Sequence, residues 1–278
     1  MACFDTPENG RAAYTRQTLE SLVQTVDFTR HRIFIVVNGG TEETHAAIAD
    51  FGKQIGQALE VIYNQKNIGT ARAINKAWAH RLPGEMCIKM DNDVVIHRAR
   101  WIEEMEEAIQ RMPKIGIIGL KRKDLAESPT SKEPQFRSQL MEVPHAPGQN
   151  NLYVEVVQHV MGTCHAFNPA LLDKIGYLCQ PGVYGYDDSL AAVRCTKAGF
   201  FNCFLLGVQI DHIDPGGDPY TAEKQRLAWD DHAEYNRIKD GIRAGTIPVY
   251  CGVDGVLGEP VTTSQTGWSH AAPNYILR

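Results

Sequence analysis

Short apolar runs that alternate with helical patterns constrain the fold of this chain more than any other feature of its sequence. The runs lie at residues 32–37, 59–63, 86–90 and 115–120. Apolar residues recur at three- and four-residue spacing before and between them, which predicts helices over residues 11–30, 41–59, 70–80 and 101–112. Strands and helices that alternate over short loops form right-handed βαβ units. The sequence therefore predicts an α/β, Rossmann-like fold with a mostly parallel sheet and helices on both faces.

The regular alternation ends near residue 120. Residues 121–151 contain four prolines and little periodicity, and irregular stretches of this length inside a domain are usually functional loops. We therefore predict a lid-like loop there. Further strands are expected near residues 154–161 and 200–208, and further helices near residues 169–175, 187–198 and 222–241. We expect a single domain over residues 1–220, divided near residue 120, and then a C-terminal helix and irregular tail over residues 221–278.

Composition excludes several classes of protein. A formal net charge of −5 argues against a protein whose whole surface binds nucleic acid or anionic membranes, because both need a basic face. Seven scattered cysteines without a C-x-x-C pair favour free thiols in a reducing compartment over a disulfide framework or a zinc site. The chain has no apolar leader near Met1, and no run approaches the roughly 20 apolar residues that cross a bilayer. We expect a cytoplasmic protein without a transmembrane segment.

Asp91, Asn92 and Asp93 follow the apolar run 86–90 directly. Ligands of open α/β sheets bind at the carboxyl ends of the strands, and carboxylate oxygens suit Mg²⁺ or Mn²⁺. Such an ion can neutralise the diphosphate of a departing nucleotide. An isolated D-x-D more often caps a turn after a strand, but the predicted position at the ligand edge of the sheet favours a metal and donor site.

Two more acidic segments carry possible chemistry. Asp187 and Asp188 stand where the helix 187–198 is expected to begin. The helix dipole alone explains acids at that position, but a carboxylate there can also act as general base toward an acceptor hydroxyl. His212 follows the strand 200–208, where a neutral imidazole can complete a metal site, although a lone histidine is more often structural.

Taken in order, five segments resemble the family 2 glycosyltransferases with the GT-A fold, and the resemblance covers about residues 11–215. The segments are Ile35–Thr44, Asn67–Lys76, Asp91–Asp93, Gly162–Gly176 and Asp187–Arg194. Five motifs in the right order rarely arise by chance. The resemblance implies that residues 1–120 bind a nucleotide-sugar and that residues 121–220 hold the acceptor and the catalytic groups.

Roles for individual residues follow from the same resemblance. Asp188 would deprotonate the acceptor hydroxyl for an inverting transfer, and Asp187 would support the base or orient the acceptor. Asp91, Asp93 and His212 would hold Mn²⁺ or Mg²⁺. The donor, with a UDP-sugar favoured, would be bound by Thr6, Pro7, Arg11, Asn38, Asn67, Gly69, Arg72, Asp91 and Asn92. Lys76 would face the diphosphate or lie on a solvated helix face.

The chain departs from the family pattern at two points. Val37 stands where relatives usually carry the aspartate that reads the nucleotide base, which leaves Asn38 as the replacement. Only Met1–Phe4 precede the loop through Thr6 and Pro7, so the first strand is very short. Both departures bear on which nucleotide binds.

Alternative functions stay open at this point. A sugar nucleotidyltransferase uses a similar sheet and metal, but residues 7–11 match its glycine-rich loop poorly. A non-catalytic nucleotide-sugar or glycan-binding module would not need Asp188 and His212. The expected acceptor is a glycan or a lipid-linked glycan. A modified DNA base is an alternative, because Lys121, Arg122, Lys123 and Arg137 can form a local basic strip.

Overall fold

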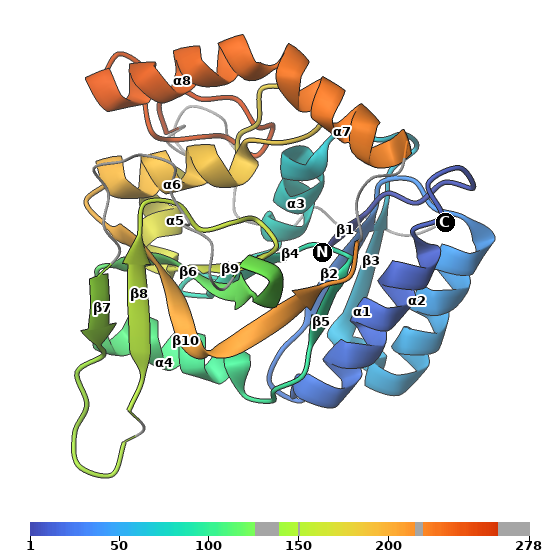
Figure 1. Ribbon diagram of the computed structural model, residues 1–278, viewed down its shortest axis with the longest axis horizontal. Helices are drawn as coiled ribbons and strands as arrows, with labels where there is room; N and C mark the ends of the chain where they lie inside the picture. Colours follow the sequence, from blue (N-terminus) through green and yellow to red (C-terminus); the bar gives the residue numbers. More distant parts are fainter. Residues whose placement is uncertain (126–138, 150, 215–218, 261–278) are drawn as a thin grey trace.

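The computed structural model describes residues 1–125, 139–149, 151–214 and 219–260. Its strands form two sheets, and helices cover them from both sides (Figure 1). Parts of the predicted loop 121–151 and of the predicted tail 221–278 lie outside the described residues, as does Arg137. No helix in the described ranges is both long and apolar enough to cross a membrane.

The first sheet is parallel, in the order β1-β2-β3. Its strands are β1 (Ala2–Cys3), β2 (Ile33–Val37) and β3 (Leu59–Tyr63). The helices α1 (Ala12–Thr25) and α2 (Glu42–Ile55) connect them, and the 3-10 turn η1 (Gly56–Ala58) precedes β3. Thr41 caps α2 by accepting a hydrogen bond from the amide of Thr44, as its position before the helical pattern predicts. The predicted βαβ units of the N-terminal part, including the very short first strand, are therefore confirmed.

The second sheet has the order β4-β9-β6-β10-β8-β7, and β5 pairs with β10. Its strands are β4 (Cys87–Met90), β5 (Val94–Ile96), β6 (Ile115–Arg122), β7 (Gln139–Glu142), β8 (Tyr153–Val157), β9 (Cys164–Phe167) and β10 (Phe201–His212). β6 and β10 are parallel, whereas β9 lies antiparallel between β4 and β6. The sheet is mixed because β8 and β9 run antiparallel to their respective neighbours β10 and β6.

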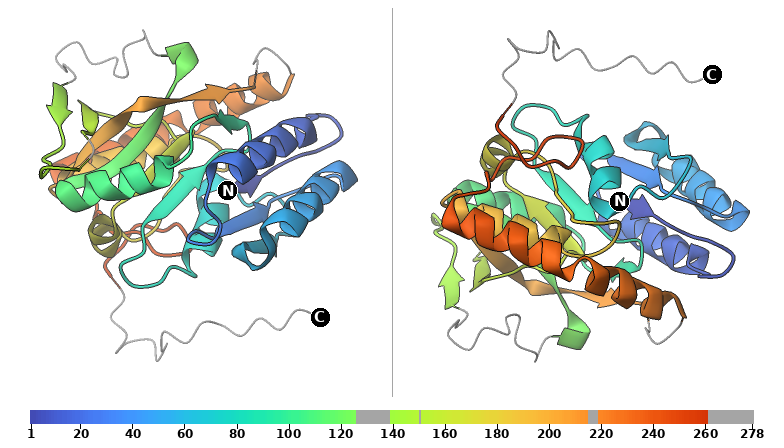
Figure 2. Two further views of the ribbon diagram at one scale, coloured as in Figure 1. Left: turned by 90° about the horizontal axis from the view of Figure 1, so that it is seen from below. Right: turned by 90° about the horizontal axis from the view of Figure 1, so that it is seen from above.

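Helices flank the second sheet on both faces. They are α3 (Thr70–Trp78), α4 (Trp101–Arg111), α5 (Pro169–Ile175), α6 (Asp187–Lys197), α7 (Pro219–Asp230) and α8 (His232–Ala244), together with the 3-10 turn η2 (Lys123–Leu125). Figure 2 shows α4 on one side of this sheet and the pair α7 and α8 on the opposite side. The α/β fold with helices on both faces agrees with the sequence prediction.

The single helix predicted over residues 222–241 is wrong, because α7 and α8 are divided at Asp231. Asp231 lies against the loop before α6: a Cβ atom added to Gly182 would sit 1.8 Å from its Oδ2. The Ala228 carbonyl accepts a hydrogen bond of 2.9 Å from the Tyr186 hydroxyl. Contacts with residues 182–186 thus hold the two helices at their junction.

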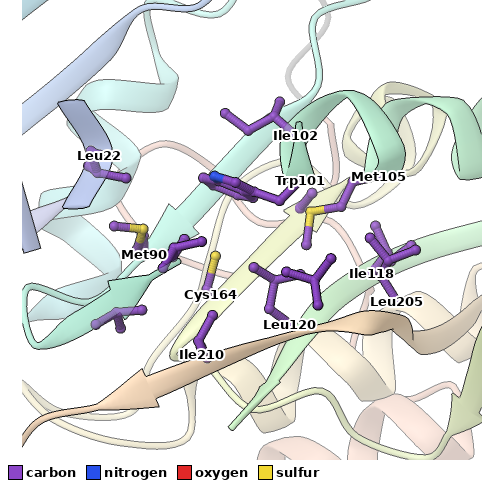
Figure 3. Packing of buried hydrophobic residues seen from close by; sticks show 14 of the residues in the cluster. Leu22, Met90, Trp101, Ile102, Met105, Ile118, Leu120, Cys164, Leu205 and Ile210 are labelled. Atoms are coloured by element: carbon purple, nitrogen blue, oxygen red, sulfur yellow. The ribbon is translucent and has the colours of Figure 1, made fainter. Parts of the chain in front are cut away.

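The largest core cluster of the described residues extends from the first sheet, α1 and α2 to α4 and the second sheet, and Figure 3 shows the part of it around α4. Trp101 and Met105 of α4 pack over Ile118, Leu120 and other buried side chains from β4, β9, β6 and β10. Full burial of one large apolar side chain stabilises a fold by roughly 1.5–3 kcal/mol. This packing fixes the central strands, and with them the ends of β4 and β10 that carry the acidic residues.

Candidate active site

The turn after β4 brings Asp93 against the end of β10. The Ile213 amide donates a hydrogen bond of 2.9 Å to the Asp93 carbonyl, and the Asp91 amide donates one of 2.9 Å to the Thr163 carbonyl. In the antiparallel pairing of β5 with β10, Val94 lies opposite His212. The predicted D-x-D turn and the predicted histidine are therefore neighbours, as the sequence interpretation requires.

Asp93, His212 and Asp214 form a group that fits a divalent cation. Their candidate ligand atoms all lie within 4.8 Å of one another. Asp93 Oδ1 and His212 Nδ1 are buried and have no hydrogen-bond partner among the described residues, so each atom keeps a lone pair or proton that these residues do not use. Burial lowers the pKa of His212 and favours the neutral imidazole that can ligate a metal. Two carboxylates and an imidazole suit Mn²⁺ or Mg²⁺.

Asp214 was not selected from the sequence, and Asp91 lies outside this group of three. Asp214 stands two residues after His212, and that spacing is the signal that could have found it. Asp91 instead contacts Lys89, with 2.7 Å between its Oδ1 and Nζ. Burial raises the pKa of Asp91 to about 6 against the opposing charge of Lys89. The role of Asp91 as metal ligand stays a prediction.

Arg11 lies on the cation-binding group itself. Its guanidinium is hydrogen-bonded to Asp93, and its Nη1 is 2.8 Å from Asp214 Oδ2. Lys224 of α7 also contacts Asp214 Oδ2, at 2.9 Å. Two buried carboxylates need compensating charge, and these two side chains supply it. Arg11, predicted in the donor-binding loop, is thus a direct neighbour of the predicted metal ligands.

The second acid pair begins α6. Asp188 Oδ2 accepts a hydrogen bond of 2.8 Å from the Gly162 amide, and its Oδ1 accepts one of 2.7 Å from the Ser189 amide. His159 Nε2 lies 3.2 Å from Asp188 Oδ2. Burial raises the pKa of Asp188, but the hydrogen bond and charge of His159 lower it by more. The net pKa of Asp188 is therefore below its ordinary value.

Lys89 joins the two acid pairs. Its ammonium lies 2.7 Å from Asp91 Oδ1 and 3.8 Å from Asp187 Oδ2, and its side chain is only 4% exposed. It also donates a hydrogen bond of 2.5 Å to the Gly162 carbonyl. Burial lowers the pKa of Lys89, but the charges of Asp91 and Asp187 raise it more, so the ammonium stays protonated. Sequence reasoning missed Lys89, although a lysine inside an apolar strand is rarely buried unpaired.

Predicted donor residues surround the turn before α3. Asn38 donates a hydrogen bond of 2.6 Å to Asn67 Oδ1, and its own Oδ1 accepts one of 3.0 Å from the Ile68 amide. Gly69 has φ +87° and approaches Val183 so closely that an added Cβ would lie 3.0 Å from its Cα. Asn38, Asn67 and Gly69 therefore brace one turn beside the loop that leads to α6.

The other predicted donor residues are less closely grouped. Arg72 is exposed on α3, and Lys76 donates a hydrogen bond of 2.5 Å to Asn64 Oδ1. Thr6 and Pro7 lie in the turn after β1, where the Thr6 amide donates to Asn9 Oδ1 at 2.9 Å. Asn92 turns inward and donates to Thr15 Oγ1 at 2.7 Å. The donor contacts of these residues stay predictions.

Asp5 is a buried carboxylate that the sequence reasoning missed. It is 1% exposed and accepts hydrogen bonds from Thr15 Oγ1 at 3.0 Å and Thr44 Oγ1 at 2.9 Å. Asn92 Nδ2 lies 3.3 Å from Asp5 Oδ1. Asp5 thus links α1, α2 and the D-x-D turn by hydrogen bonds, one residue before the predicted donor loop at Thr6 and Pro7.

The predicted basic strip is neutralised where it is described. Lys121 pairs with Glu155 at 3.0 Å, Lys123 pairs with Asp211 at 2.8 Å, and Arg122 pairs with Asp124. Arg137 lies outside the described residues. The described part of the strip gives no support to a nucleic-acid acceptor.

A large cavity lies away from these acids. A cavity of about 680 Å³ opens between the first sheet and β4 at the amino ends of the strands. Its lining includes Met1, Ile33, Trp78, Met86 and Trp101, and none of the acid-pair residues. The chemistry of the carboxylates, rather than the size of a cavity, therefore identifies the site.

Comparisons with known proteins identify the family of this chain. The model of the family Glycosyl transferase family 2 matches residues 8–176, which is more than half of the chain. The chain therefore belongs to glycosyl transferase family 2, and the resemblance predicted from the five motifs is confirmed. Among curated proteins, none matches this sequence.

Several solved structures share the fold. The mannosyltransferase PcManGT from Pyrobaculum calidifontis, in complex with GDP-Man and Mn²⁺, is 16% identical, with a TM-score of 0.59 over 88% of this chain and 67% of the other. GalNAc-T7 with UDP, GalNAc and Mn²⁺ is 12% identical, with a TM-score of 0.56 over 88% of this chain and 50% of the other. TarS from S. aureus is 15% identical, with a TM-score of 0.59 over 87% of this chain and 63% of the other.

The matched regions span from half to about two thirds of those three proteins. At these identities the likeness concerns the fold, and it confirms the predicted GT-A type of α/β architecture.

Proposed function

We propose that this member of glycosyl transferase family 2 transfers a sugar from a nucleotide-sugar donor to an acceptor hydroxyl with the help of a divalent cation. The observation that carries the proposal is the joining of two acid pairs at one site. Asp93 belongs to a group that fits a cation. Asp188 has its carboxylate oriented by backbone amides, and Lys89 lies between the two pairs.

In this proposal Asp93, His212 and Asp214 hold Mn²⁺ or Mg²⁺. The bound ion supplies positive charge to the diphosphate leaving group. Arg11, whose guanidinium already lies beside Asp93 and Asp214, contributes a second positive charge for the donor phosphates. Two of the similar structures contain Mn²⁺ together with GDP-Man or with UDP and GalNAc, which supports a metal and a nucleotide-sugar but not one particular base.

Asp188 acts as the general base. Its carboxylate accepts the proton of the acceptor hydroxyl, the oxygen attacks the anomeric carbon, and the nucleoside diphosphate leaves on the opposite face with inversion. The amides of Gly162 and Ser189 hold the carboxylate in one orientation during this step. Asp187, buried beside Lys89, orients the acceptor or the base.

The finer assignments extend this proposal. We favour a UDP-sugar donor, with its base near Thr6, Pro7 and Asn38, and a glycan or lipid-linked glycan acceptor. We also propose a reducing, cytoplasmic location, which the seven free and buried cysteines support. Membership of the family favours transfer over the synthesis of nucleotide-sugars by a nucleotidyltransferase.

Release of nucleoside diphosphate from UDP- and GDP-sugars with Mn²⁺ tests the proposal in wild type, Asp93→Asn and Asp188→Asn. Loss of Asp188 should lower release by about 10²- to 10⁴-fold, the usual contribution of a general base, while Mn²⁺-dependent donor binding persists. Asp93→Asn should lose both nucleotide release and Mn²⁺-dependent donor binding. Asp173→Asn is the matched control, because this exposed carboxylate on α5 lies outside the site. A non-catalytic binding module would bind the donor equally well in wild type and Asp188→Asn and release nothing in either.

A further inference from the structure

His159 lies beside the proposed base but belongs to none of the recognised motifs. It stands in the loop between β8 and β9, and its side chain is 29% exposed. Its neighbours hold this loop in position. Asn202 donates a hydrogen bond of 3.1 Å to the Gln158 carbonyl, and Val160 is buried in the apolar cluster under α6. The imidazole is therefore presented to α6 by an anchored stretch of backbone.

The partners of Asp188 differ in one chemical respect. The amides of Gly162 and Ser189 and the Ser189 hydroxyl can donate hydrogen bonds to the carboxylate, but they do not take up a proton near neutral pH. His159 Nε2, at 3.2 Å from Asp188 Oδ2, can. Among the described residues that contact Asp188 through a hydrogen bond or ion pair, His159 is the one proton acceptor.

We propose that His159 is a positioning residue that receives, through Asp188, the proton removed from the acceptor hydroxyl. The proposal rests on the transferase function proposed above. The proton passes from the acceptor oxygen to the Asp188 carboxylate and then to Nε2 of a neutral His159. The acceptor oxygen keeps the electron pair and forms the new glycosidic bond, and the bond from sugar to diphosphate breaks with its electrons on the leaving phosphate. His159 returns the proton to solvent before the next turnover.

The surroundings determine when His159 is neutral. Asp187, Asp188 and Ser189 face it from α6 and His165 from β9, while Lys89 of β4 interacts with Asp188 and Tyr235 of α8 interacts with Ser189. Burial lowers the pKa of His159, but the hydrogen bond and charge of Asp188 and the charge of Asp187 raise it more, so the net pKa lies above the ordinary 6.5. Because only the neutral imidazole accepts a proton, transfer should fall as the pH decreases through this raised pKa.

A side-chain NMR titration tests the pairing without substrate. The histidine resonances of the full chain are followed against pH in wild type, and His159→Gln identifies the signal of His159. Asp188→Asn should bring the pKa of His159 down from its wild-type value, whereas Asp173→Asn, an exposed carboxylate elsewhere, should leave it unchanged. An equal pKa of His159 in wild type and Asp188→Asn would overturn the proposal.

The pH profile of nucleoside diphosphate release tests the proton transfer. Glutamine keeps a hydrogen-bond donor for Asp188 but does not titrate. His159→Gln should lower the rate by roughly 10-fold, less than the loss of a base in direct contact, and should remove the acid limb that wild type shows. His159→Asn serves as the second variant if glutamine lowers the melting temperature.

A profile of His159→Gln that matches the shape of the wild-type profile would contradict the proposal, because a merely structural histidine changes the rate without changing its pH dependence. If wild type releases no nucleotide from any donor, the proposed function fails and the relay fails with it. The NMR titration still decides in that case whether His159 and Asp188 are coupled, so the two failures are distinguishable.

Discussion

The acid pairs Asp91–Asp93 and Asp187–Asp188 both contact the ammonium of Lys89, but their other partners differ. Asp91 and Asp187 both face the buried ammonium of Lys89. Asp93 lies among Arg11, at the N-cap of α1, His212, the last residue of β10, and Asp214, just after β10. Asp188, in contrast, is held by two backbone amides and a single imidazole.

This difference is the basis on which we propose different roles for similar acids. A carboxylate next to a second carboxylate and an imidazole offers ligands to a cation. A carboxylate that is fixed by amides and paired with one histidine is oriented for proton transfer. The sequence motif alone states neither role, because the surroundings of each pair come from segments far apart in the chain. Five substitutions, in four experiments, test the comparison.

Replacing Lys89 by methionine should have the largest effect, because it removes the charge that both pairs share. Breaking a buried ion pair by deleting one partner typically destabilises a protein by about 3–5 kcal/mol. Chemical denaturation measures this loss in free energy of unfolding. Lys66→Met, at an exposed position, should change stability by less than about 0.5 kcal/mol. Equal stability of the two variants would show that Lys89 does not link the pairs.

Asp93→Asn and Asp91→Asn should distinguish the roles of the two acids that follow β4. Mn²⁺ affinity, measured by electron paramagnetic resonance, should fall by more than about 100-fold in Asp93→Asn, since even groups that only orient a ligand contribute about 10- to 100-fold. Asp91→Asn should lower it by less than about 10-fold, because Asp91 lies outside the group of three. Equal losses in both variants would place Asp91 among the ligands.

Gly162→Ala should disturb the contact between the pairs by crowding. An added Cβ would lie 2.7 Å from Lys89 Nζ and 3.3 Å from Asp188 Oδ2. Overpacking of this kind usually lowers stability by about 1–3 kcal/mol, and here it should also lower nucleotide release. Gly258→Ala is the control, because no atom of the described part of the chain lies within 4 Å of its added Cβ. Thermal denaturation that does not distinguish the two variants would contradict the close packing at Gly162.

His159→Gln should have the smallest effect on stability, about 1 kcal/mol, with a defined pH dependence. The raised pKa of His159 makes its contribution complete below the ordinary 6.5 and lost as the pH rises through the folded-state value. The lowered pKa of Asp188 makes its contribution complete above the ordinary 3.8 and lost on acidification. The stability difference between His159→Gln and wild type should therefore be greatest between the ordinary pKa values of 3.8 and 6.5. A stability difference that grows above pH 8 would contradict the ion pair.

The elements that surround the site were largely predictable because they follow local rules. The apolar runs became β2, β3, β4 and β6, and the predicted helices 41–59, 70–80 and 101–112 formed within a few residues of their expected bounds. The acids Asp91, Asp93, Asp187 and Asp188 and the histidine His212 were recognisable from spacing and motif, and they do meet at one edge of the second sheet.

The partners of those acids were not predictable, because they depend on tertiary contacts. β9 has only four residues, which is too short for a sequence pattern to predict its antiparallel position between β4 and β6. Its insertion brings the loop with His159 and Gly162 to the start of α6. Likewise, Arg11 reaches Asp214 across 203 positions of sequence. The division of α7 from α8 depends on similar distant contacts with the loop before α6.

Our main proposal is that Asp93, together with His212 and Asp214, binds a cation and a nucleotide-sugar. A thermal-shift panel of UDP-, GDP-, CDP- and dTDP-sugars, each with Mn²⁺ and with EDTA, tests it most directly, because a bound ligand raises the melting temperature by mass action. We expect an upward shift with one nucleotide class that requires Mn²⁺ and is absent in Asp93→Asn. A shift that is equal in Mn²⁺ and EDTA, or no shift with any of the four classes, would contradict it.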